Sequence, residues 1–92
     1  MALSGQKTVT TAGTAVALGS QQIAGPLQIK ALTTNTGLVY VGNDGAADVT
    51  SANGYPLAPG DVVVIEEVSN LGAIFVDSAV DGEGVAWIAA KL

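Results

Sequence analysis

The chain has 92 residues, of which 49% are hydrophobic and 12% charged, and its net charge is −5. This length predicts a single domain spanning residues 1–92. Three lysines and no arginine exclude the clustered phosphate contacts of a nucleic-acid-binding protein and the basic patch of a protein that binds anionic membranes.

Short runs rich in valine, isoleucine and threonine alternate with turn residues along the chain, a pattern typical of an all-β protein. The pattern predicts strands, in chain order, at residues 6–11, 14–19, 25–34, 37–43, 61–68, 72–78 and 84–92, with a short extra strand around 47–50. Turn-forming tetrapeptides lie between them at residues 34–37, 42–45, 69–72 and 81–84. This spacing predicts a small jelly-roll-like antiparallel β-sandwich of about seven or eight short strands.

The stretch SANGYPLAPGD, residues 51–61, predicts a sharp corner of the chain. Asn53-Gly54 is the dipeptide of a two-residue hairpin turn with positive φ at both central positions. Pro59-Gly60 fits the central positions of a type II turn, because proline presets φ and glycine accepts a positive φ. Two turns therefore bring the chain round within a few residues.

The corner leads into the apolar run DVVVIEEV, residues 61–68. An unbroken apolar run predicts a strand that is covered on both faces. Within the corner, Pro56 forces Tyr55 into an extended conformation. Tyr55 is also a candidate for an exposed tip that touches a partner.

Catalytic chemistry is not predicted, and no catalytic or cofactor-binding residue is proposed. Without histidine there is no Ser-His or Cys-His pair, and no serine is marked as a partner for a lysine. Glu66 and Glu67 are neighbours on a predicted strand, so they point to opposite faces and cannot share a substrate. Asp77, Asp81 and Glu83 lie together in a loop region of a chain too small for a sugar cleft between them.

The same acidic turns are the candidates for a metal site. Zinc, copper and iron lack histidine and cysteine ligands. Residues 77–84 and 42–45 offer oxygen ligands for calcium, but their spacing does not match the helix-flanked calcium loop. Solvated acidic turns are the favoured interpretation, and no metal site is predicted.

The four aromatic residues leave two interpretations open. Tyr40, Phe75 and Trp87 fall within predicted strands and are interpreted as core residues, with a sugar-stacking surface as the alternative. The low charge content favours a protein packed against copies of itself or a partner, because the centres of interfaces are depleted in charge. We therefore expect a homo-oligomer.

The motifs TVTTAGTAVAL, LQIKALTTNTGLVYVGN, NGYPLAPGD and IFVDSAVDGEGVAWIAA follow one another over most of residues 6–90. Together they resemble small structural proteins of tailed bacteriophages, which are short, cysteine-free β-sandwich or jelly-roll proteins. GYPLAPGD and NTGLVYVGN are the most specific parts of this resemblance. It implies a role in virion structure, either as a head-decoration (cement) protein or as a small component of the neck, tail or fibre.

The resemblance and the composition together give the functional expectation. We expect a capsid decoration protein, a homotrimer made in the host cytoplasm, that binds the outside of the major capsid lattice and stabilises the assembled state by mass action. Residues 1–11 are expected to form an extended N-terminal arm, and loop tips 43–48 and 53–56 to contact a partner or face outward. The alternatives are a neck, tail or fibre component, and a carbohydrate- or receptor-binding module that uses Tyr55 or Trp87.

Overall fold

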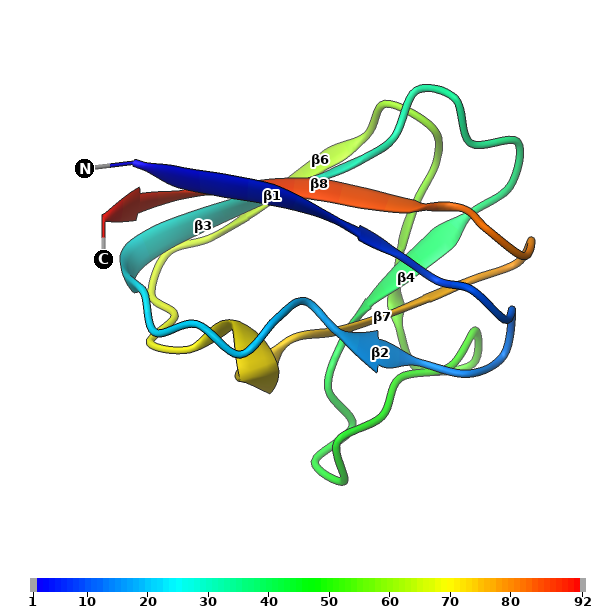
Figure 1. The fold of residues 1–92 in the computed structure, drawn as a ribbon. Coiled ribbons are helices and arrows are strands. Elements are labelled where there is room, and N and C mark those ends of the chain that lie inside the picture. The colour runs from blue at the N-terminus through cyan, green and yellow to red at the C-terminus, as the bar shows by residue number, and fades with distance from the viewer. Residues whose placement is uncertain (1, 92) are drawn as a thin grey trace.

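The structure is a computed structural model and describes residues 2–91. It contains eight strands and one short 3₁₀ helix (Figure 1). In chain order these are β1 (Leu3–Thr8), β2 (Val16–Ala17), β3 (Ala24–Ala31), β4 (Val39–Gly42), β5 (Tyr55–Leu57), β6 (Val62–Ile65), η1 (Leu71–Ala73), β7 (Phe75–Ser78) and β8 (Gly84–Lys91). The extra strand predicted around residues 47–50 is not formed, and the additional strand is β5 instead.

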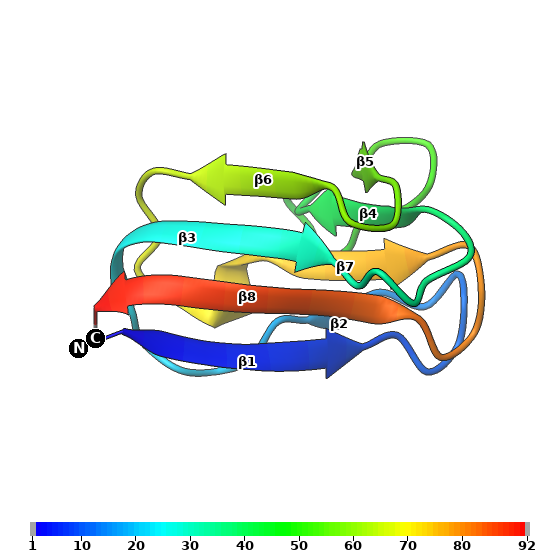
Figure 2. The same ribbon diagram turned by 90° about the horizontal axis from the view of Figure 1, so that it is seen from above.

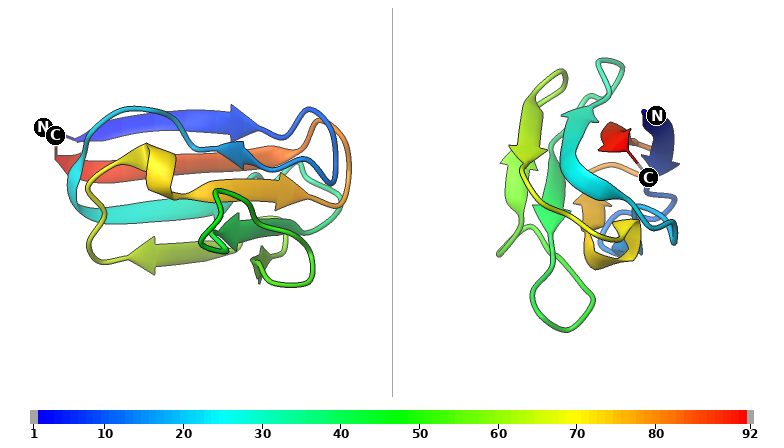
Figure 3. Two further views of the ribbon diagram at one scale, coloured as in Figure 1. Left: turned by 90° about the horizontal axis from the view of Figure 1, so that it is seen from below. Right: turned by 90° about the vertical axis from the view of Figure 1, so that its left-hand side faces the viewer.

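The strands form two antiparallel four-stranded sheets with the orders β1-β8-β3-β6 and β2-β7-β4-β5. The sheets face each other as two layers (Figures 2 and 3). β1 pairs with β8, β2 with β7, β3 with β6 and β4 with β5. A long antiparallel ribbon of such pairs, wound into two layers, is a jelly roll. The predicted fold class is confirmed.

Alternation along the central strands places the core between the sheets. In β3, Leu27, Ile29 and Ala31 are buried, whereas Gln28 and Lys30 are exposed. Each large apolar side chain removed from water contributes roughly 1.5–3 kcal/mol. The buried cluster consists of Val9, Leu18, Ile23, Leu27, Ile29, Ala31, Val39, Val41, Leu57, Val68, Leu71, Val76, Val85 and Ala89.

The prediction that residues 61–68 are covered on both faces is wrong. β6 is an edge strand of its sheet. Val63 and Ile65 pack against the core, but Val62 is 46% exposed and Val64 is 53% exposed. An unbroken apolar run does not reveal whether a second layer covers its outer side, and here no part of residues 2–91 does so.

The N-terminal strand begins earlier than predicted. β1 spans Leu3–Thr8, and it pairs with β8 along its whole length instead of projecting as the arm expected for residues 1–11. Gly5 lies opposite Trp87, and a Cβ at Gly5 would lie 2.9 Å from Cζ2 of that indole. The indole thus occupies the space that Gly5 leaves free, and a contact between residues so far apart in the chain has no local sequence signal. Met1 and Leu92 lie outside the described residues.

The corner at residues 51–61 confirms one predicted turn and corrects the other. Gly60 has φ +88°, and the Asp61 N–H donates to the Ala58 carbonyl oxygen at 2.8 Å, as expected of the Pro-Gly turn. The prediction of a hairpin turn at Asn53-Gly54 is wrong, because neither residue has a positive φ. Gly54 is required by close packing instead, since a Cβ there would lie 2.6 Å from the Tyr40 Cβ.

Candidate interaction surface

The acidic residues of the β7–β8 region hold neighbouring loops in place. Glu83 Oε2 accepts hydrogen bonds from the Thr36 N–H at 2.6 Å and the Thr36 hydroxyl at 2.9 Å, and Oε1 accepts from the Gly37 N–H at 3.0 Å. Beside this clamp, the buried Asn35 side chain donates to the Gly84 carbonyl oxygen at 2.8 Å. Both contacts join the segment after β3 to the start of β8.

Two aspartates act in the same way on the segment that precedes β2. Asp77, only 3% exposed, accepts hydrogen bonds at Oδ1 from the Gly13 N–H at 2.9 Å and the Ser78 N–H at 2.8 Å. Asp81 Oδ1 accepts from the Ala12 N–H at 2.7 Å. These carboxylates, which were interpreted as solvated turns, brace loops. Within residues 2–91 no three His, Cys, Asp or Glu side chains are grouped so that they could hold a metal ion.

The hydrogen bonds of Glu83 to Thr36 and Gly37, here called the Glu83 clamp, lead to a prediction about pH. The N–H groups of Gly37 and Thr36 lower the pKa of Glu83 below its ordinary value of 4.5. A lowered folded-state pKa contributes stability that is present above the unfolded value and is lost as pH falls through the folded value. We expect the difference in thermal midpoint between wild type and Glu83→Gln to shrink as pH falls below 4.5. Melts from about pH 6 down to about pH 3 measure it, and a difference that does not change with pH would contradict the clamp.

The aromatic residues do not gather into one platform. Trp87 is partly buried and packs against the core, in agreement with its interpretation as a core residue. Tyr40 and Phe75 are also partly buried, but they alternate with the core residues Val39, Val41 and Val76 and so lie on the side of their sheet away from the core. Their interpretation as core residues is therefore wrong. Tyr55, in the edge strand β5, is 60% exposed. Of the aromatics, Tyr55 alone offers most of its surface to a partner.

The loop tip at residues 43–48 is exposed and internally bonded. Asn43 Oδ1 accepts from the Gly45 N–H at 2.8 Å, and Asp44 Oδ1 accepts from the Ala46 N–H at 2.8 Å. The Asn43 side chain also donates to the Ala73 carbonyl oxygen at 3.1 Å, next to η1. These bonds fix the shape of the tip. They also occupy side-chain groups that would otherwise be available to bond a partner.

The outward side of the sheet β1-β8-β3-β6, here called the outer face, is uncovered and holds three of the exposed large apolar residues, Val62, Val64 and Ile88. The pairing register aligns its residues in rows, one of which runs Ser4, Ile88, Gln28, Val64 across the four strands. Ile88 is 46% exposed, which is similar to the exposure of Val62 and Val64. The outer face consists of Ser4, Gln6, Thr8, Pro26, Gln28, Lys30, Val62, Val64, Ala86, Ile88 and Ala90.

Charge is almost absent from the outer face. Lys30 is its one charged member, although the chain contains eight acidic residues. The acids lie in the loops, after β6, or on the other sheet, as Asp77 on β7 does. The eight acidic residues therefore all lie outside the outer face, so docking this face on an uncharged protein surface removes few charged groups from water.

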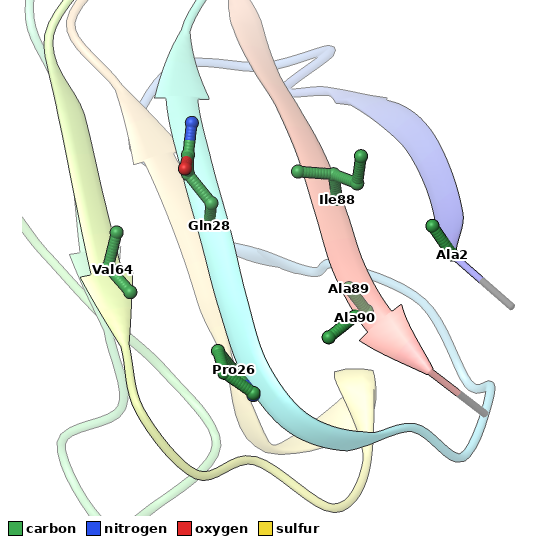
Figure 4. Close-up of a pocket in the computed structure, with 7 residues that line it drawn as sticks. All are labelled: Ala2, Pro26, Gln28, Val64, Ile88, Ala89 and Ala90. Carbon is green, nitrogen blue, oxygen red and sulfur yellow. The ribbon is translucent and has the colours of Figure 1, made fainter.

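The outer face is shallowly hollowed between its strands. One hollow of about 240 Å³ is lined by Ala2, Pro26, Gln28, Val64, Ile88, Ala89 and Ala90 (Figure 4). A second, of about 160 Å³, is lined by Gln28, Lys30, Ala86, Trp87 and Ile88. Both are open and mostly apolar, unlike an enclosed ligand pocket with converging polar groups. Their shape suits contact with another protein surface.

Comparisons with protein-family models, with curated proteins and with solved structures return no match. No helix within residues 2–91 has the length and apolar character to cross a lipid bilayer. Sequence reasoning missed the outer face, because it assigned the apolar residues of 61–68 to the interior. The available signal was the low charge content of strands that must each have one outward side.

Proposed function

We propose that this protein is a structural component that works by docking its outer face on another protein, most specifically as a decoration protein on the outside of a tailed-phage capsid. The observation that carries the proposal is the combination of a net charge of −5 with one sheet face that has exposed valine and isoleucine and no acid. Exposed apolar side chains that gather on one face, and are not scattered singly, favour an interaction surface.

The physical mechanism is linkage. A protein that binds the assembled lattice and not its separated subunits stabilises the lattice by mass action. A rigid sandwich loses little conformational entropy on docking. Hydrogen bonds from Glu83, Asp77 and Asp81 to neighbouring loops support a surface that is formed before docking.

Two further points support a virion role. The run of motifs in residues 6–90 resembles small virion proteins of tailed phages. Jelly rolls are also used by viral capsid proteins and by lectins, although fold alone does not imply function.

A neck, tail or fibre site is the second location for the same docking mechanism. The sequence leads us to expect a homo-oligomer, and the solution mass tests whether it is the expected homotrimer.

A carbohydrate-binding module is the second candidate function. It is favoured by Tyr55, which lies within the corner at residues 51–61 and is 60% exposed. An exposed aromatic ring can stack on the apolar face of a sugar. Glycan-array screening of wild type and Tyr55→Ala separates the two functions. Glycan binding that is lost in the variant supports the carbohydrate-binding module, whereas capsid binding that the variant keeps supports the decoration protein.

The proposed function is tested with capsids that lack decoration. Purified protein is titrated onto undecorated phage capsids, and bound protein is measured by sedimentation. We expect saturable binding, with a fixed number of copies per lattice site, and a higher temperature of capsid disruption. Electron micrographs then distinguish lattice sites from a single neck or tail ring. Absence of saturable binding to any virion part would refute the proposal.

A further inference from the structure

The four edge strands of the sandwich are unequally protected against pairing with another chain. β2 has two residues, and β5 has three, including Pro56, which cannot donate a backbone hydrogen bond. β6 has four residues and lies between Asp61 and Glu66. β1, by contrast, is the longest of the four with six residues, and it has no proline and no acid. Short strands, proline and charge are the usual protections of a sheet edge, and the one charge of Lys7 is the only one of these in β1.

The alternation of hydrogen bonds between β1 and β8 shows which backbone groups of β1 point toward its free edge. The Val9 N–H donates to the Glu83 carbonyl oxygen at 2.8 Å, directly after the pair Thr8↔Gly84. In an antiparallel pair, residues alternate between facing the partner strand and facing away. Leu3, Gly5 and Lys7 therefore pair with β8, and the backbone groups of the alternate residues point outward. Those residues are Ser4, Gln6 and Thr8.

We propose that a second copy of this chain adds to the free edge, with β1 paired antiparallel to β1 of the other copy around a twofold axis at Gln6, in place of the homotrimer expected from the sequence. In this register Gln6 faces Gln6, Ser4 faces Thr8, and Gly5 faces Lys7. The outward backbone groups of Ser4, Gln6 and Thr8 then satisfy each other across the axis. The same segment serves both copies, as an isologous interface requires.

Charge favours this occupant over the same pairing at β6. Two β6 strands placed antiparallel would bring Asp61 of one copy toward Glu66 of the other, and like charges opposite each other are destabilising. In the β1 pair the one charge of the strand is Lys7, which faces Gly5 and not a second Lys7. The β1 edge is therefore the edge at which an acidic protein can meet itself without repulsion.

The purpose of this pairing rests on the proposed function, because the pairing enlarges the surface that docks. Four strands about 4.8 Å apart, with lengths of six, eight, eight and four residues, make a face of roughly 400 Å². Stable interfaces bury about 800 Å² on each partner. Joining two copies through β1 makes one continuous sheet, in which the two outer faces together reach that area. One copy alone would dock only weakly.

The pairing is tested by a substitution that acts on the free edge alone. The Gln6 N–H points away from β8, so Gln6→Pro removes an intermolecular donor while leaving the β1–β8 hydrogen bonds intact. Gln6→Thr is the matched control, since it keeps the N–H. By light scattering we expect wild type and Gln6→Thr to have twice the chain mass of 9.1 kDa, and Gln6→Pro to have the mass of one chain.

A second measurement uses only wild-type protein and covers the case in which Gln6→Pro fails to fold. Amide hydrogen exchange of Ser4, Gln6 and Thr8 is expected to slow at least tenfold between dilute and concentrated protein, whereas the amides of β6 stay unchanged. A monomer at all concentrations, a trimer, or a Gln6→Pro dimer would overturn the proposal. Capsid binding by a protein that stays monomeric would refute the pairing and leave the proposed function standing.

Discussion

The double variant Val64→Glu and Ile88→Glu is expected to lose capsid docking, with affinity reduced by roughly 100-fold or more. Val64 and Ile88 lie in one row of the outer face on either side of Gln28. If this row is the centre of the interface, docking would bury two carboxylates without partners, and unpaired buried charge is strongly unfavourable. Both side chains are about half exposed in the free protein, so the fold itself is expected to tolerate the change.

The control for this variant is Leu38→Glu and Val80→Glu. Leu38 is 40% exposed and Val80 39% exposed, which makes them comparable to Ile88, but neither lies on the outer face. This control adds the same charge to the protein and removes the same kind of side chain. Sedimentation with capsids measures docking, and circular dichroism confirms folding. Equal loss of binding in both double variants would show that net charge, and not the outer face, governs docking.

The parts of the fold that were predictable are those governed by neighbouring residues. Strict alternation in β3 identified its core side, and the Pro59-Gly60 turn followed from the φ preferences of the two residues. The start of β1 was not predictable, because it depends on Trp87 occupying the space beside Gly5. Gly54 shows the same limit, since packing against Tyr40 requires this glycine and no positive φ does.

The candidate surface was harder to predict than the fold. Alternation separates two sides of a strand only when one side is polar, and in β6 both sides are valine or isoleucine. The sequence therefore could not show that Val62 and Val64 remain uncovered. The acidic turn, in contrast, looked like solvated surface, because the amides that Glu83 accepts from lie more than forty residues away in the chain.

The two segments on which the phage resemblance partly depends meet in space. Asn35 of the NTG turn bonds to the backbone of Gly84, and Glu83 bonds to the amides of Thr36 and Gly37. One turn donates hydrogen bonds from its backbone N–H groups, and the acidic turn accepts them through the Glu83 carboxylate. Together the two turns form one structural unit, which closes one end of the sandwich. These residues therefore have a structural role, and the outer face is the region where we expect binding.

Gly84→Ala is expected to destabilise the fold by about 3 kcal/mol or more, a large share of the roughly 5–15 kcal/mol that stabilises a typical domain. A Cβ at Gly84 would collide with the carbonyl oxygen of Lys7 and lie 3.0 Å from the Thr8 Cα. These are backbone atoms of the paired strand β1, which cannot rotate away as a side chain can. Relief requires β1 to separate from β8, and the hydrogen bonds between Asn35 and Gly84 would be strained at the same time.

Thermal unfolding measures this effect, and a loss of this size corresponds to a fall in midpoint of more than about 10 °C for a domain of this length. Ala86→Ser is the matched control, because it lies two residues along the same strand on the outer face. It changes one atom group without approaching the backbone of β1, so its midpoint is expected to stay within a few degrees of wild type. Similar midpoints for Gly84→Ala and wild type would mean that β1 does not pack against β8 as closely as described. The free edge of β1, which depends on this pairing, would then lose its basis.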